Sequence, residues 1–277
     1  MRLSELGPNA TALYRVAFAL PFLLLWLALE RRPAASNGAA RRRKISRSDW
    51  LVLALSGVFW SGDLVFWHWS ISLTNVANST FFACSSPIFV ILGAWLLFGE
   101  RISRGFLAGF ALTLAGGACL LGSSLAFGGG DFLGDIFGIV TAFFFGSYIL
   151  TIKHLRSGLP TGAIMFWSGL FSLPGLLLAA LLTGEVFVSE SLFGWSMIIG
   201  LALLAHTVGQ GLAAYALAHL PASFASVAFL GEPVVAAILG WIILAEALGP
   251  LQGAGCIIIL AGVWLAQRYG MRRQSGA

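Results

Sequence analysis

The sequence predicts an all-α integral membrane protein, an inverted-repeat helix bundle with nine visible transmembrane spans. Composition is the first reason, because 58% of the 277 residues are hydrophobic, 10% are charged and the mean hydropathy is +0.91, unlike a soluble domain. The second is a set of apolar stretches of about 20 residues, the length that crosses a hydrocarbon core of ~30 Å. The third is a segment that occurs twice, at residues 75–122 and 221–268.

The spans are read directly from the apolar stretches. They lie near residues 10–29, 50–72, 76–98, 105–124, 133–152, 162–183, 193–216, 223–244 and 249–267. Cys84, Cys119 and Cys256 fall inside them without CxxC spacing, which is typical of packing residues and not of a metal site. The sequence also lacks HExxH, a Gly-rich phosphate loop and a GxSxG motif. We therefore expect no enzyme activity, no cofactor and no metal.

The repeat relates its two copies at a constant separation of 146 residues, without a gap. The matched pairs are Pro87 and Pro233, Trp95 and Trp241, Glu100 and Glu246, Gly109 and Gly255, and Gly116 and Gly262. Each copy is an apolar run, a short turn with a Glu and a second apolar run, which indicates a pair of membrane helices. Internally repeated helix bundles in lipid are typical of transporters.

Basic residues fall almost entirely on one side of this topology. Of the 16 Lys and Arg, only Arg2 lies on the other side and Arg15 lies within a span. The rest lie at residues 31–47, 101–104, 153–156 and 268–273. The positive-inside rule assigns that side to the cytoplasm. We expect a multi-pass protein of the inner (plasma) membrane with loop 31–48 and the C-terminus cytoplasmic, and no binding of nucleic acid.

The repeated segment also resembles a known family. Its first copy runs from Ser86-Pro87 through Trp95-Leu96-Leu97-Phe98-Gly99-Glu100-Arg101 to Gly109, Gly116 and Gly117, and its second from Glu232-Pro233 through Trp241 and Glu246 to Gln252, Gly255 and Gly262. These features resemble the EamA repeat of the drug/metabolite transporter superfamily. The resemblance implies ten helices in two inverted five-helix repeats, which move by alternating access around a site near the midplane.

The two repeats predict the domain organisation. Residues 1–124 hold the first EamA repeat with four spans, and residues 125–277 hold the second with five spans and a short basic tail. Aligned on their prolines, the copies leave the family's helix one without a counterpart at the start of the sequence. A truncation, an upstream start codon or a nine-helix protein each account for this difference.

Polar residues within the spans indicate where a site lies, because a charge at membrane depth costs about 2.5–3.5 kcal/mol on insertion scales. They are Arg15, Asp63, His68, His206, Gln210 and Glu232. On span 50–72 the i, i+3, i+7, i+11 spacing of Trp60, Asp63, Trp67 and Ile71 predicts one inward face. At the repeat separation Trp60 corresponds to His206 and Leu64 to Gln210. Two related helices are thus expected to frame a central cavity.

Glu232 and Pro233 form a separate signal. Proline has no N–H for the carbonyl of Phe229, so it predicts a helix break with free backbone polarity. A carboxylate beside such a carbonyl suits a cation or a proton. The first copy has Ser86-Pro87 at this place, and we expect a helix break at Pro87 too.

From these patterns we expect a substrate site built from polar and aromatic side chains. Its predicted members are Trp60, Asp63, Trp67, Phe82, Tyr148, His206, Gln210 and Glu232, with Asp63, His206 and Glu232 as candidates for proton coupling. Each has a structural alternative: the carboxylates or His206 could be hydrogen-bonded within the helix packing, and Arg15 could snorkel to the interface.

The predicted function is transport of small polar metabolites. The resemblance implies outward movement of amino acids or related compounds, whose apolar side chains the aromatic residues could contact. Alternatives are a nucleotide-sugar or other metabolite uptake carrier of the same fold, or a non-transporting membrane interaction protein. The expected partners are a small-molecule substrate and the lipid bilayer, and assembly of two copies into a homodimer stays open.

Overall fold

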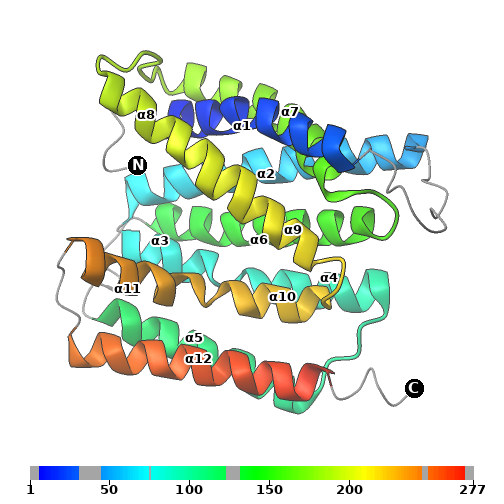
Figure 1. Ribbon diagram of the computed structural model, residues 1–277. Coiled ribbons are helices and arrows are strands. Elements are labelled where there is room, and N and C mark those ends of the chain that lie inside the picture. Colours follow the sequence, from blue (N-terminus) through cyan, green and yellow to red (C-terminus); the bar gives the residue numbers. More distant parts are fainter. Residues whose placement is uncertain (1–5, 31–44, 75, 123–131, 245–248, 272–277) are drawn as a thin grey trace. The chain divides into compact units, whose positions relative to one another are not determined.

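The computed structural model describes residues 6–30, 45–74, 76–122, 132–244 and 249–271, and its regular structure there is entirely helical (Figure 1). The helices are α1 (Pro8–Glu30), α2 (Arg47–Leu73), α3 (Val76–Ala83), α4 (Ser86–Phe98), α5 (Arg104–Leu121), α6 (Phe132–Arg156), α7 (Thr161–Leu182), α8 (Leu192–Gly200), the π-helical segment η2 (Leu201–Gln210), α9 (Gly211–Ala216), α10 (Ala222–Phe229), α11 (Glu232–Leu244) and α12 (Pro250–Met271). Nine helical stretches of the described chain are long and apolar enough to cross a membrane. The predicted all-α class and the nine spans are confirmed.

Two spans are interrupted at equivalent places in the two repeats. Pro87 follows a break between α3 and α4, and Pro233 follows a break between α10 and α11. Because a proline removes the hydrogen bond to the carbonyl four residues back, α3 ends at Ala83 and α10 ends at Phe229. Each proline occupies the second position of the following helix, where the missing N–H costs nothing.

The chain forms two compact units, and each unit draws helices from both repeats. Unit 1 comprises Met1–His68 and Ser147–His219, and unit 2 comprises Trp69–Gly146 and Leu220–Ala277. The compact units therefore differ from the sequence repeats that the division at residue 124 follows.

Unit 1 is built around the packing of α1 and α7. A Cβ atom at Gly162 of α7 would lie 2.8 Å from the backbone nitrogen of Leu27 of α1, and one at Gly57 of α2 would lie 2.6 Å from the Cβ of Phe171 of α7. These backbones approach one another so closely because small residues stand at the crossings, as is common between membrane helices.

Unit 2 is built around α5 and α12, which pack along their length. A Cβ at Gly116 would lie 2.6 Å from the backbone nitrogen of Ile259, and one at Gly255 would lie 2.5 Å from that of Leu120. A Cβ at Gly262, the repeat mate of Gly116, would lie 2.6 Å from the backbone nitrogen of Thr113. The two repeat mates therefore serve the same helix contact from opposite helices, which explains why the glycines occur in both copies.

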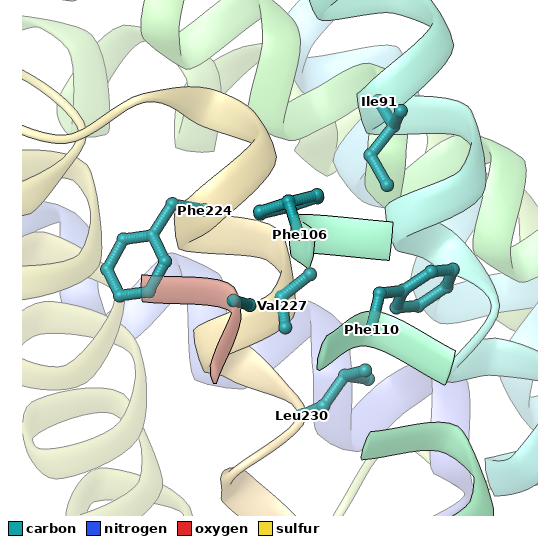
Figure 2. Packing of buried hydrophobic residues seen from close by; sticks show 7 residues of the cluster. Ile91, Phe106, Phe110, Phe224, Val227 and Leu230 are labelled. Atoms are coloured by element: carbon teal, nitrogen blue, oxygen red, sulfur yellow. The ribbon is translucent and has the colours of Figure 1, made fainter. Parts of the chain in front are cut away.

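A cluster of apolar side chains fills the interior of unit 2 beside this pair. Figure 2 shows Phe106 and Phe110 of α5 with Phe224 and Val227 of α10 and Leu230 at its end, all buried. Dispersion contacts of large side chains stabilise helix packing where lipid supplies no hydrophobic driving force. With Ile91 of α4 and Ala266 of α12, this cluster packs α10 against α4 and α12 just before the break that precedes α11.

Candidate functional site

The interior of unit 1 contains three ring-bearing side chains from distant parts of the sequence. The ring centroid of Trp60 on α2 lies 4.8 Å from that of Tyr148 on α6 and 5.6 Å from that of His206 in η2. Their exposed fractions are 4%, 4% and 2%. We call these three residues the ring cluster, and it brings together three of the predicted site residues.

The buried face of α2 is turned slightly from the predicted one. Trp60, Leu64 and His68, spaced by four residues, are buried, whereas Asp63 and Trp67 are half-buried. Asp63 still lies close enough to Tyr148 for an electrostatic interaction. The charge of this carboxylate therefore acts on one member of the ring cluster.

His206 belongs to the π-helical segment. The hydroxyl of Thr207 donates to the carbonyl of Ala202, five residues back, at 2.9 Å. A π-helix has a wider turn than an α-helix, and such segments are frequent at functional sites. Gln210 is the last residue of this segment and is half-buried. The local change of register determines which side chains of the helix are buried with Trp60.

The ring cluster holds polar atoms whose hydrogen-bonding capacity is unused within the described residues. Both ring nitrogens of His206 and the indole Nε1 of Trp60 are buried there without a hydrogen-bond partner. The hydroxyl of Tyr148 differs, since it donates to the sulfur of Met165 at 3.8 Å. Burying an unpaired polar atom costs about 1–3 kcal/mol, and native structures pair nearly all such atoms. Pockets for small ligands combine aromatic walls with a few polar groups of this kind.

A cation stands beside these rings. The guanidinium carbon of Arg15 on α1 lies 5.8 Å from the ring centroid of Trp60, within the range of a cation–π interaction. Its charge also interacts with His206 and His68. The sequence marked Arg15 as a polar residue at membrane depth but gave no sign of its contact with Trp60.

A second polar group in unit 1 joins α1, α2 and the segment after α7. The side-chain nitrogen of Asn9 donates to Glu185 Oε1 at 2.8 Å, and the side-chain oxygen of Asn9 lies 3.2 Å from His68 Nδ1. That amide orientation makes His68 Nδ1 the donor. Nε2 of His68 is buried without a partner among the described residues. Sequence reasoning singled out His68 alone of these three residues.

The remaining predicted residues, Phe82 and Glu232, belong to unit 2. Phe82 is half-buried on α3, and its Cβ lies 2.8 Å from the position of a Cβ at Gly138. Glu232 is exposed in the first turn of α11. Their participation in a site with the ring cluster stays a prediction.

Unit 2 also contains a small, partly open pocket of a different character. Its lining includes Thr80, Cys84, Leu230 and Pro233, beside the break between α10 and α11. The lining is almost wholly apolar, so the pocket offers no set of groups for a polar ligand. In the described parts of the chain no group of three His, Cys, Asp or Glu residues is placed to hold a metal ion.

The described part of the chain combines nine apolar helical stretches, matched helix breaks in two repeats and a buried polar cluster. Together these are features of a multi-pass membrane transporter. The sequence matches the EamA-like transporter family over residues 1–122 and 132–267. The chain belongs to this family.

Curated relatives carry names of transporters. A probable terminal-alkyne amino-acid exporter of Streptantibioticus cattleyicolor is 26% identical over 250 residues, which are 87% of this chain and 82% of the relative. A probable amino-acid metabolite efflux pump of Salmonella typhimurium is 30% identical over 183 residues, 63% of this chain and 61% of the relative. A pseudopaline exporter, CntI, of Pseudomonas aeruginosa is 24% identical over 216 residues, 78% of this chain and 74% of the relative.

The fold also has a counterpart among solved structures. A solved crystal structure superposes with a TM-score of 0.76 at 18% identity, covering 99% of this chain and 91% of the other. At this identity the likeness concerns the fold alone. The match along nearly the whole chain agrees with the family assignment.

Proposed function

We propose that this transporter moves small polar metabolites, amino acids among them, out of the cell by alternating access of its inverted repeats. The observation that carries the proposal is the buried ring cluster of unit 1, with Arg15 on the face of Trp60 and Asp63 beside Tyr148. Charges of both signs beside aromatic rings match a zwitterion that carries an apolar side chain.

The relatives support the same class of substrate. Three of them are named for the export of an amino acid, an amino-acid metabolite or pseudopaline. Their identity to this chain is between 24% and 30%. We take from them the direction of transport and the class of substrate, and leave the individual compound to experiment.

The paired helix breaks support alternating access. Pro87 and Pro233 interrupt equivalent spans of the two repeats, and interrupted helices are typical of transporters that bind substrate near the midplane. We propose an inner-membrane location with loop 31–48 and the C-terminus in the cytoplasm, as the distribution of Lys and Arg favours. A reporter fused to the C-terminus that is active only in the cytoplasm tests this orientation.

Counterflow in proteoliposomes tests the transport activity. Vesicles loaded with one unlabelled amino acid are placed in buffer with a trace of the same amino acid in labelled form. We expect saturable accumulation of label for several amino acids, with competition among them, and none in vesicles without protein. Saturable exchange of nucleotide sugars in place of amino acids would contradict the proposed substrate class, and no exchange of any metabolite would contradict transport.

A further inference from the structure

The donor groups of the ring cluster carry an inference about the part of the substrate that they bind. We infer that Trp60 Nε1 and the imidazole of His206 form a carboxylate subsite, the place where the acidic group of a transported metabolite is held. This inference rests on the proposed function and names the group that the site recognises.

The side chains of Trp60 and His206 lie close together in the interior of unit 1. Trp60 and His206 come from α2 and η2, their rings lie 5.6 Å apart at 50°, and both are almost fully buried. The indole nitrogen and both imidazole nitrogens have no hydrogen-bond partner within the described chain. Two adjacent side chains therefore bring unused hydrogen-bonding capacity to the same part of the interior of unit 1.

The chemistry of these nitrogens favours a carboxylate as their partner. An indole nitrogen only donates, and an imidazole always donates through at least one nitrogen. A carboxylate is acceptor-only and satisfies both donors at once, whereas an ammonium group finds at most one acceptor here. Hydrogen bonds to an ionised group are also stronger than neutral ones.

The charge around the two donors also favours a carboxylate. Arg15 lies over the face of Trp60 at 5.8 Å and its charge interacts with His206, so the two donors lie in a positive field. Asp63 is close enough to Tyr148, the other neighbour of Trp60, to interact with it electrostatically. An amino acid with its carboxylate at Trp60 and His206 would direct its ammonium group toward Asp63.

Gly169 of α7 borders the subsite. A Cβ there would lie 3.9 Å from His206 Nε2, 3.5 Å from Val16 Cγ1 and 3.3 Å from Leu20 Cδ2. These are tolerable distances, so Gly169→Ala should fold. The added methyl group would nevertheless lie beside His206 Nε2 and reduce the space available to a ligand oxygen there.

The experiment compares each amino acid with the amine that lacks its carboxylate, for example phenylalanine with phenethylamine. Counterflow measures transport, and the shift in the thermal unfolding midpoint measures binding independently. The variants are Trp60→Phe, which keeps a ring and removes the donor, and Gly169→Ala. Trp95→Phe on α4, at a position with 58% exposure, is the matched control.

We expect the wild type and Trp95→Phe to bind and exchange the amino acid and not the amine. Trp60→Phe and Gly169→Ala should each weaken amino-acid binding about tenfold or more, as expected for a lost hydrogen bond to a charged group. Equal exchange of amine and amino acid would overturn the subsite while leaving transport intact. If the wild type binds the amino acid without exchanging it, and Trp60→Phe abolishes that binding, the subsite is supported and the transport proposal is overturned. Absence of both binding and exchange would overturn the two proposals together.

Discussion

The carboxylate of Glu185 accepts a hydrogen bond from the backbone N–H of Ala10 at 2.8 Å. It thereby caps the first turn of α1 from the segment that follows α7. Glu30, the last residue of α1, accepts from the backbone N–H of Gly162 at 2.8 Å and caps the first turn of α7. The first turn of each helix is thus capped by a carboxylate at or just beyond the C-terminal end of the other helix. Such reciprocity is expected when the two helices come from inverted repeats.

The first prediction concerns this cap. Glu185→Gln removes the negative charge, which stabilises a helix N-terminus by about 0.3–2 kcal/mol. It also replaces one of the two oxygens that accept from Asn9 and Ala10 with an NH2 group. We expect a lower thermal unfolding midpoint in detergent, with Glu190→Gln at an exposed position in the same loop as control. Equal midpoints for the two variants would show that the charge of Glu185 at the N-terminus of α1 contributes nothing to stability.

The second prediction concerns the contact of α5 with α12. A Cβ at Gly116 would meet the backbone nitrogen of Ile259 at 2.6 Å, whereas one at the adjacent Gly117 would meet nothing within 4 Å. Gly116→Ala should therefore destabilise the protein by about 1–3 kcal/mol, as overpacking does. Gly117→Ala is the matched control, and it should be neutral or stabilising by up to about 1 kcal/mol, because Ala favours a helix over Gly.

Thermal unfolding of the two purified variants distinguishes these cases. A loss of stability in both would mean that helix packing around α5 has no room on either side. Retention of stability in both would mean that α5 and α12 can move apart to accept a methyl group.

The third prediction concerns the break at Pro233. Pro233→Ala supplies an N–H that can bond to the carbonyl of Phe229, so α10 and α11 could join into one helix. We expect unchanged or higher stability with slower exchange, because interrupted helices allow local movement. Pro174→Ala, inside the continuous helix α7, is the control for removing a proline. Wild-type exchange rates in Pro233→Ala would contradict a role for the break in transport.

The sequence contained the signals for the spans and for both breaks, because length, hydropathy and proline act locally along the chain. It placed the inward face of α2 less accurately. In a membrane helix nearly every face is apolar, and the facing is decided by small-residue crossings such as Gly57 against Phe171 and Gly175 against Ser61. Those pairings are long-range, and one sequence does not reveal them.

The candidate site shows the same limit. Trp60, Tyr148 and His206 were each predicted as site residues, but their contact with one another depends on the packing of three separate helices. The π-helical register around His206 and the link from Asn9 to Glu185 left no pattern in the residue types. Phe82 and Glu232 were predicted from the same signals and belong to unit 2.

The last prediction concerns energy coupling through Asp63. If this half-buried carboxylate carries a proton, an imposed difference of one pH unit supplies about 1.4 kcal/mol, enough for about tenfold accumulation at one proton per substrate. Asp63→Asn should lose this accumulation. It should keep counterflow at equal pH when the substrate concentration is raised to offset the lost contact with the ammonium group, since counterflow needs no net proton movement. Asp135→Asn, in the first turn of α6, is the control and should accumulate as the wild type does. Gradient-driven accumulation by Asp63→Asn would exclude Asp63 as the carrier and leave His206 and Glu232 as the candidates, to be tested in the same assay.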